Sequence, residues 1–204
     1  MLLHLNDSSE TEKREDDQDW FQGIDDRFKT KSAYIKYNCE MRIRGYMKEV
    51  RNYAQTIQTP KLKDRYMQTA DYLMMQLKSD KFNGCYFDRT EEEQNRLCTK
   101  EGWFNCQGAF DQVKCEFHHS INPYGNRESR IIFSTWNLDH IIEKRRTVIP
   151  DLVGALKKPK RRDIDLDHFY KLLFTRENLK LVHIVCHKKG ARDESKLYKR
   201  RKSK

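Results

Sequence analysis

The pentapeptide Trp136-Asn137-Leu138-Asp139-His140 is the segment from which the rest of the chain is best interpreted. An apolar run ends there on a carboxylate next to an imidazole. Asn178 and Cys186-His187-Lys188-Lys189 follow downstream, and His187 comes nine residues after the asparagine. A carboxylate and a neutral imidazole can hold a divalent cation, while a second imidazole can accept a proton near neutral pH. This spacing predicts a site for metal-assisted hydrolysis.

Hydrolysis of a phosphodiester bond is the reaction that these side chains suit. The attacking water must be deprotonated near neutral pH, and the leaving oxygen gains negative charge that a cation can neutralise. Magnesium prefers few protein ligands and several waters, so Asp139 and His187 are its predicted ligands. His140 is the predicted general base, Asn178 the amide that braces its loop, and Lys189 a contact for a phosphate oxygen. One alternative is that Asp139 and His140 form an ordinary hydrogen-bonded pair and that Asn178 is a turn or cap residue.

The flanking residues predict a frame that would bring the two histidines together. Residues 130–136 are expected to form a strand that leads into Asp139-His140, and residues 179–185 a second strand. Cys186-His187 would then begin a final helix. A two-strand hairpin with a helix packed across it would place His140 close to His187.

Most of the remaining chain is predicted to be helical. Apolar residues recur at helical spacing from residue 32 to about residue 57, and Pro60 is expected to open a second helix with one apolar face. A short helix is expected over residues 151–156, and Asp165 is expected to cap a helix that runs through Phe174. Together with the hairpin, these elements predict a mainly helical α+β domain.

Residues 80–129 lack a helical or strand period and contain glycines and a proline that mark turns. Cysteines and histidines are scattered through the segment: Cys85, Cys98, Cys106, Cys115, His118 and His119. A long loop-rich segment in a compact domain needs something to hold it, and a bound metal would do so. Because the start of the chain does not resemble a secretory signal, the cysteines are predicted to be thiols or metal ligands in the cytosol or nucleus.

The charge of the chain is strongly positive but unevenly spread. The formal net charge of the 204 residues is +10, yet residues 1–19 hold seven acidic and two basic side chains. The remainder therefore carries +15, which suits a polyanionic partner, although a basic surface without an anionic ligand is the simpler alternative. No apolar run is long enough to span a bilayer, so no membrane partner is expected.

Basic residues are densest at the C-terminal end, where Lys199-Arg200-Arg201-Lys202 is the strongest cluster. This tail is predicted to be a nuclear-localisation signal, a phosphate-binding tail or both, with a solubilising tail as the alternative. Contacts of this kind to phosphates are sensitive to salt and independent of sequence. No motif for reading bases is visible, so weak sequence preference is expected.

Asp139-His140, Asn178 and His187 resemble the motif of the HNH (ββα-metal) nucleases. Longer stretches resemble the caspase-activated DNase family more closely, over about residues 19–190. These stretches are Asp19-Trp20-Phe21-Gln22-Gly23, Phe87-Asp88-Arg89, residues 122–130, residues 133–144 and residues 177–189. The resemblance implies an HNH catalytic core, a magnesium-dependent endonuclease of double-stranded DNA, 5′-phosphate and 3′-hydroxyl ends, and cutting in chromatin linkers during apoptosis.

The resemblance also implies further site residues and partners. Cys106, Cys115, His119 and Cys186 match the ligands of a structural zinc ion, a set of thiolates and imidazole that suits tetrahedral zinc. Lys31, Tyr46 and His183 fall where the family has residues associated with activity. Lys31 is a candidate for phosphate contact, with a solvated surface charge as the alternative. Tyr46 suits a helical core equally well, and His183 suits a structural role in its strand. A homodimer, an inhibitor subunit and a nuclear location, preceded by a cytoplasmic one, are further expectations.

The chain departs from the family at Arg192, where the family often has a histidine, and a guanidinium cannot carry a proton there. The expected partition is an acidic linker or remnant over 1–19, a nuclease domain over 20–190 and a basic tail over 191–204. The nuclease domain divides into a helical scaffold over 32–79, a zinc-binding loop segment over 80–129 and the HNH core over 130–190. Because the family's N-terminal regulatory domain and most of its dimerising helices are not matched, an inactive core fragment is one rival interpretation. A zinc-stabilised nucleic-acid-binding module without catalysis is the other.

Overall fold

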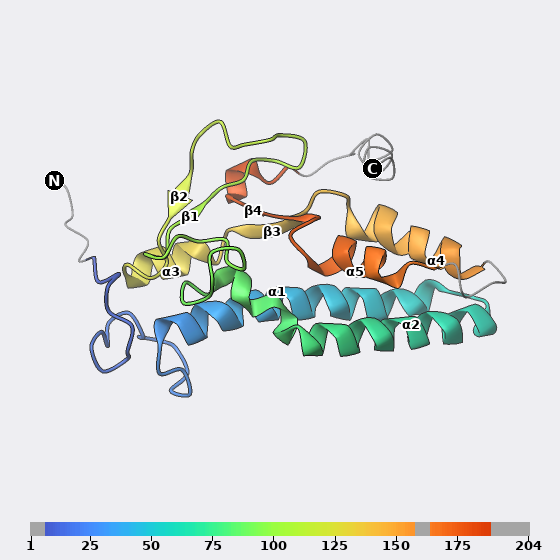
Figure 1. Ribbon diagram of the computed structural model, residues 1–204, viewed down its shortest axis with the longest axis horizontal. Helices are drawn as coiled ribbons and strands as arrows, with labels where there is room; N and C mark the ends of the chain where they lie inside the picture. The colour runs from blue at the N-terminus through green and yellow to red at the C-terminus, as the bar shows by residue number, and fades with distance from the viewer. Residues whose placement is uncertain (1–6, 158–163, 189–204) are drawn as a thin grey trace. The chain divides into compact units, whose positions relative to one another are not determined.

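The computed structural model describes residues 7–157 and 164–188, and over these residues the chain is α+β, as predicted (Figure 1). Its contacts divide it into two compact units, which are described separately. Unit 1 consists of Met1–Met41, Gly84–Leu138 and Leu181–His187. Unit 2 consists of Arg42–Asn83, Asp139–Lys180 and Lys188–Lys204.

Two long helices form the predicted scaffold, α1 (Lys31–Asn52) and α2 (Pro60–Ser79). α1 gives way to a 3₁₀ turn (Tyr53–Thr56), so it ends slightly earlier than the apolar pattern predicted. Pro60 opens α2 because the first turn of a helix needs no amide hydrogen from that residue. α2 buries Tyr66, Thr69, Ala70, Leu73 and Leu77 on one face.

Two shorter helices, α4 (Ile149–Lys157) and α5 (Leu166–Phe174), pack against α2 in unit 2 (Figure 1). α5 begins where Asp165 accepts a hydrogen bond from the backbone N–H of His168 at 2.9 Å, which confirms the predicted cap. Its residues from Phe169 to Phe174 are buried except for Lys171. A five-residue π-helical segment (Lys144–Val148) leads into α4. Packing among these helices forms the core of unit 2.

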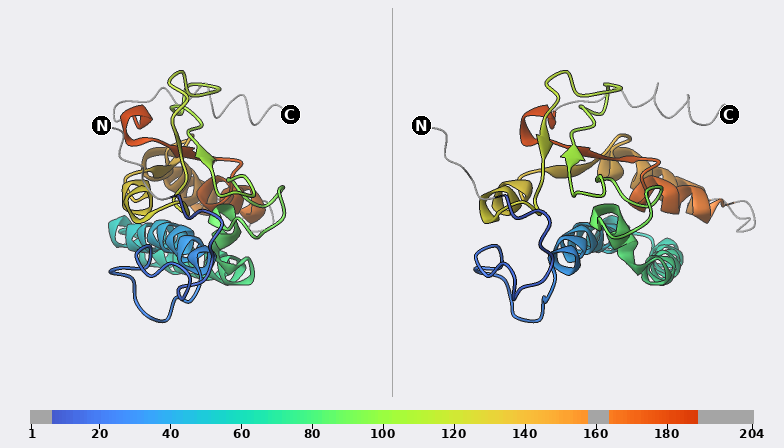
Figure 2. Two further views of the ribbon diagram at one scale, coloured as in Figure 1. Left: turned by 90° about the vertical axis from the view of Figure 1, so that its left-hand side faces the viewer. Right: turned by 60° about the vertical axis from the view of Figure 1, so that its left-hand side comes forward.

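Unit 1 is built from loops, a short sheet and a helix around an aromatic core. β1 (Phe104–Asn105) pairs antiparallel with β2 (Ser120–Ile121), and the two strands lie side by side in Figure 2. Phe87, Phe104 and Phe133 form edge and tilted ring contacts at centroid distances of 4.7–5.3 Å. Such aromatic contacts add to the free energy gained from burying the rings.

Residues 7–19 pack within unit 1 instead of extending as the acidic linker that the sequence predicted. The backbone N–H of Ser8 donates to the carbonyl oxygen of Gly125 at 2.8 Å, and Asp17 forms an ion pair with Lys31. Trp20, just after this segment, is buried and donates its indole N–H to the carbonyl oxygen of Pro123. Residues 7–19 are therefore held by hydrogen bonds and an ion pair to the rest of unit 1, although none of them is itself buried.

The strand predicted over residues 130–136 is wrong, because this segment lies largely in α3 (Arg127–Phe133). The side chain of Asn126 accepts a hydrogen bond from the backbone N–H of Ser129 at 2.8 Å and so caps the helix. Phe133 is buried, whereas Ile131 and Ile132 are half-exposed. The cap outweighs the preference of the isoleucines for a strand.

The predicted hairpin is present but shorter than expected. β3 (Asn137–His140) and β4 (Leu179–Val182) form the second two-stranded sheet. The second strand stops at Val182 because the next three residues after His183 form a 3₁₀ turn, η5 (Ile184–Cys186). Cys186 thus ends a 3₁₀ turn instead of beginning a helix, and the chain after Lys188 lies outside the described residues. Among the described residues, no helix has both the length and the apolar character needed to cross a membrane.

Candidate metal centre and candidate catalytic residues

Four side chains of unit 1 converge on one point. Their ligand atoms all lie within 4.8 Å of one another, and they belong to Cys106, Cys115, His119 and Cys186. Cys106 follows β1, Cys115 and His119 precede β2, and Cys186 ends η5. The sequence-based resemblance named the same four residues, and the structure brings them together. His118, which precedes His119 in the chain, is exposed and lies outside the cluster.

Backbone hydrogen bonds hold the loops that carry this cluster. The N–H of Cys106 donates to the carbonyl oxygen of His119 at 2.8 Å, and the side-chain oxygen of Gln107 accepts from the N–H of Leu181 at 2.7 Å. The turn at Gly108 has φ +74°, and a Cβ there would lie 2.6 Å from the carbonyl oxygen of Lys114. Glycine is therefore required at this turn. Gln107 was missed from the sequence because an amide side chain in a loop has no distinguishing pattern.

The geometry of the cluster fits a tetrahedral metal ion. The Sγ atoms of Cys115 and Cys186 are 3.7 Å apart, and Nδ1 of His119 lies 3.5 and 3.4 Å from them. Tetrahedral zinc with Zn–S bonds of about 2.3 Å requires sulfur atoms about 3.8 Å apart. Nδ1 is the nitrogen of His119 that faces the sulfur atoms, so it would be the ligand atom for a metal bound there.

The thiols of the cluster differ in their tendency to ionise. Burial opposes ionisation of Cys115, but backbone N–H groups of His119 and Phe117 outweigh it and lower the pKa of this thiol to about 6. Burial, reinforced by the neighbouring thiols of Cys115 and Cys106, raises the pKa of Cys186 to about 12. A divalent cation would allow all three sulfur atoms to be thiolates at neutral pH. The donor set therefore suits a bound cation.

Cys115→Ser is expected to lower the metal content and the melting temperature of the purified chain together. Loss of a ligand should weaken metal binding by more than the roughly 10–100-fold that loss of an outer partner costs. Cys98→Ser is the matched control, since Cys98 is another buried thiol of unit 1 but lies outside the cluster. Elemental analysis and thermal melts provide the measurement. One full equivalent of metal in Cys115→Ser would show that the ligand set is wrong.

His140 is a buried histidine of unit 2 whose ring orientation is set by the backbone. Its Nε2 lies 2.9 Å from the carbonyl oxygen of Leu173. Because a carbonyl only accepts, Nε2 carries the proton of the neutral ring and Nδ1 is the nitrogen able to take one. Tyr46 contacts the ring edge-on at a centroid distance of 4.8 Å. The ammonium of Lys144 lies 4.4 Å from the centre of the Tyr46 ring.

Asn178 is fully buried and joins the chain after β3 to α5. Its Oδ1 accepts from the N–H of Ile142 at 2.8 Å, while its Nδ2 donates to the carbonyl oxygens of Ile142 and Leu172 at 3.0 and 2.7 Å. Each polar atom of the amide thus has a buried partner. These hydrogen bonds can hold the segment after His140 in place, which is the role expected of Asn178.

The other predicted site residues are distributed as follows. Asp139 is half-buried in unit 2 and His187 is half-buried in unit 1, so a cation shared between them stays a prediction from the sequence. Lys189 and Arg192 lie outside the described residues. His183 is half-buried beside the cysteine cluster, where burial and then the neighbouring His119 lower its pKa.

Lys31 has a structural position instead of the predicted contact with phosphate. Its side chain is fully buried, and its Nζ forms an ion pair with Asp17 at 2.8 Å. The same atom donates to the carbonyl oxygens of Ser8 and Tyr124 at 2.8 and 2.9 Å, and to Oγ1 of Thr11 at 2.9 Å. Burial lowers the pKa of Lys31, and the hydrogen bond and charge of Asp17 oppose that shift. Asp17 was missed from the sequence because it stands in a run of acidic residues.

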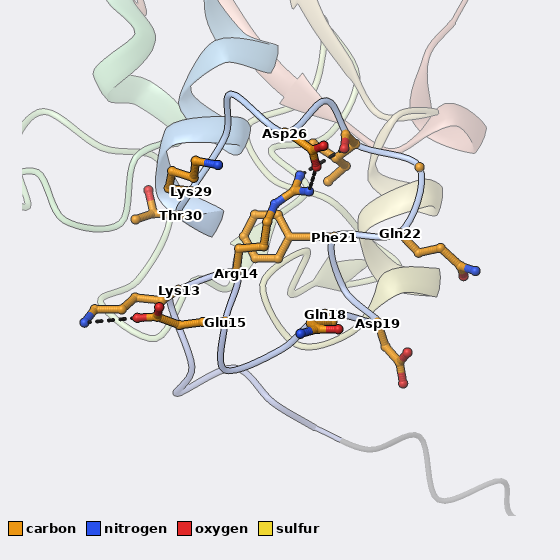
Figure 3. A pocket seen from close by; sticks show the side chains of 12 residues that line it. Lys13, Arg14, Glu15, Gln18, Asp19, Phe21, Gln22, Asp26, Lys29 and Thr30 are labelled. Atoms are coloured by element: carbon orange, nitrogen blue, oxygen red, sulfur yellow. Dashed lines mark hydrogen bonds and ion pairs between the residues drawn. The ribbon is translucent and has the colours of Figure 1, made fainter.

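A pocket of about 870 Å³ opens in unit 1, at the N-terminal segment (Figure 3). The Arg14 guanidinium lies 4.8 Å from the centre of the Phe21 ring and forms an ion pair with Asp26. Lys13 and Glu15 pair with each other at its edge. None of the predicted catalytic or metal-binding residues lines this pocket.

The fold and the cysteine cluster define an α+β protein with a candidate structural metal centre. The chain belongs to the DNA fragmentation factor 40 kDa family, whose model matches residues 1–202. The DNA fragmentation factor subunit beta of Homo sapiens is 51% identical over 203 residues, covering 97% of this chain and 60% of the relative. The protein of the same name from Bos taurus is 46% identical over 202 residues, covering 97% and 59%.

A solved structure agrees with this assignment. The crystal structure of caspase-activated DNase (CAD) matches with a TM-score of 0.90 and 52% identity, covering 94% of this chain and 78% of that one. The family expected from the sequence is thereby confirmed. The chain spans about three fifths of the length of the curated relatives that it matches.

Proposed function

We propose that this chain is the catalytic part of a magnesium-dependent endonuclease that hydrolyses double-stranded DNA with little sequence preference. Membership of a family named for DNA fragmentation supports the substrate, as does the net charge of +10. The observation that carries the catalytic part is the buried His140, held by a backbone carbonyl with Nδ1 as its basic nitrogen. A general base must be fixed in one tautomer to take a proton efficiently.

In the proposed reaction, Nδ1 of His140 takes the proton from the attacking water. Asp139 and His187 are the proposed magnesium ligands, because a carboxylate and an imidazole leave most positions around the ion to water, as magnesium prefers. A bound magnesium ion would supply charge neutralisation at the phosphate and the leaving 3′ oxygen. Asn178 keeps the backbone after His140 in place, and Lys189 is proposed to contact a phosphate oxygen. The products would carry 5′-phosphate and 3′-hydroxyl ends.

A structural zinc ion is the proposed occupant of the Cys106, Cys115, His119 and Cys186 cluster. Three thiolates and one imidazole at tetrahedral distances are the ligand set that zinc takes in closed structural sites. Such an ion would tie the loop between β1 and β2 to η5. The ion would therefore stabilise unit 1 and take no part in the chemistry.

The names of the relatives support the proposed partner subunit, and the basic C-terminal residues support the proposed location. The curated relatives are each named as one subunit of a DNA fragmentation factor, which supports a second, inhibitory subunit in the full protein. A homodimer is proposed for the full protein as well. The basic residues from 191 to 204 support nuclear import, and a cytoplasmic stage before activation is the corresponding proposal.

One experiment separates cutting from binding. The purified chain, dialysed free of Mg²⁺, is incubated with a fluorescent DNA duplex without added divalent cation, its binding is followed by gel shift, and Mg²⁺ is then added. We expect a salt-sensitive shift before Mg²⁺ addition and shortened duplex after it. A shifted duplex that stays full length would favour a zinc-stabilised nucleic-acid-binding module, and neither a shift nor a cut would indicate an inactive core fragment.

A further inference from the structure

His183 lies beside the cysteine cluster and contacts it first through its backbone. Its N–H donates to Sγ of Cys106 at 3.3 Å. A hydrogen bond to a ligand sulfur withdraws negative charge from the thiolate and fixes its direction, as outer partners of metal ligands commonly do. Cys106 is one of the four cluster residues, so this bond restrains the first of them.

The imidazole of His183 also shapes the turn that carries a second cluster residue. Its Nδ1 accepts from the N–H of Val185 at 3.3 Å, which makes His183 the N-cap of η5. Cys186 is the last residue of that turn. Because a three-residue turn has little hydrogen bonding of its own, a side-chain cap contributes much of what fixes it.

The same ring packs against a third cluster residue. The rings of His183 and His119 stack with their centroids 4.1 Å apart and an angle of 22° between the planes. Trp136, which is buried, contacts the His183 ring edge-on at 5.4 Å. The His119 ring is thereby held against a ring that is itself held by the core of unit 1.

We propose that His183 is the positioning residue of the metal cluster, orienting Cys106, His119 and Cys186 at once. The proposal rests on the proposed zinc occupancy and adds a role for a residue that binds no metal itself. It makes specific the structural role expected of His183 from the sequence, in place of the association with activity that the family resemblance implied. Nδ1 accepts from a backbone N–H, so that nitrogen of the neutral ring is already used in the fold.

Four single substitutions of His183 each remove a different set of its contacts, so their effects can be told apart. His183→Ala removes both the cap and the stacked ring, His183→Asn keeps an acceptor suited to an N-cap, and His183→Phe keeps a ring for His119. His183→Pro additionally removes the N–H donated to Cys106. His183 has φ −63° and follows a strand, so proline fits its backbone. His168→Ala is the control, because His168 is a half-buried histidine outside unit 1.

The measurement is the rate at which zinc passes from each purified chain to a chromophoric chelator, with the visible spectrum of the Co²⁺-substituted chain beside it. We expect zinc release from His183→Ala to be roughly 10–100-fold faster than from wild type. His183→Asn and His183→Phe should each recover part of this loss. His183→Pro should release zinc faster than His183→Ala and shift the sulfur-to-cobalt charge-transfer band. His168→Ala should match wild type in both readouts.

Thermal melting of the zinc-free chains in EDTA distinguishes a role of His183 in positioning the metal ligands from a general contribution of His183 to stability. A positioning role predicts that the difference in melting temperature between wild type and His183→Ala shrinks once zinc is removed. Zinc release from His183→Ala at the wild-type rate would overturn the role of His183 while leaving the zinc site intact. Wild-type chain that binds no zinc would instead overturn the zinc site, and the role of His183 with it.

Discussion

His140→Ala is expected to lower the single-turnover rate of duplex cleavage in Mg²⁺ by roughly 10²–10⁴-fold, because a general base contributes about that much. The alanine also leaves the carbonyl oxygen of Leu173 without its hydrogen-bond donor. A loss of rate could therefore reflect a loosened fold. His140→Gln addresses this, since its amide can donate to the same carbonyl but cannot accept a proton as a base.

Both variants should lose the rate to a similar extent, while His140→Gln should melt closer to wild type. His168→Ala is the matched control in unit 2, because its ring packs beside Phe169 on α5. Thermal melts and gel-shift binding to the duplex accompany the rates. Near-full cleavage by either His140 variant would remove this residue as the base.

Lys31→Met is expected to lower the free energy of unfolding by about 3–5 kcal/mol, the usual cost of breaking a buried ion pair. Methionine fills the space of the aliphatic stem but leaves the Asp17 carboxylate without its cation. The carbonyl oxygens of Ser8 and Tyr124 lose a donor as well. Adding Asp17→Asn removes the uncompensated charge, so the double variant should recover part of the loss.

Lys13→Met is the control for this prediction. Lys13 forms an ion pair with Glu15 at 3.5 Å, and the two side chains are 66% and 74% exposed. Exposed pairs contribute about 0–1 kcal/mol, so its effect should be small. Urea unfolding provides the free energies, and gel shifts provide DNA affinity. Unchanged stability of Lys31→Met together with weakened DNA binding would restore the predicted contact with phosphate.

Local signals in the sequence predicted the helices well. Pro60 and Asp165 each begin a helix through an interaction within one turn, so their roles follow from neighbouring residues alone. The strand expected over residues 130–136 is absent because another local signal acts there. The Asn126 side chain caps the helix through the backbone N–H of Ser129, and this cap outweighs the strand preference of Ile131 and Ile132.

Contacts between distant segments could not be derived in this way. Sγ of Cys186 meets Sγ of Cys115 across 71 positions of the chain, and only the family resemblance linked them. The partner of Lys31 is one of seven acidic residues near the N-terminus, none of which the sequence distinguishes. Burial and pairing of charges depend on the folded chain, so the structural role of Lys31 cannot be derived from the sequence alone.

Cleavage of supercoiled plasmid by the purified wild-type chain is the most direct measurement of metal-dependent DNA hydrolysis. With Mg²⁺ we predict nicked and then linear plasmid, no cleavage without added divalent cation, and cleavage once Mg²⁺ is supplied to the same sample. Plasmid that stays supercoiled in Mg²⁺ with the chain in excess would contradict the proposed nuclease activity. Equal cleavage with and without Mg²⁺ would contradict its metal dependence.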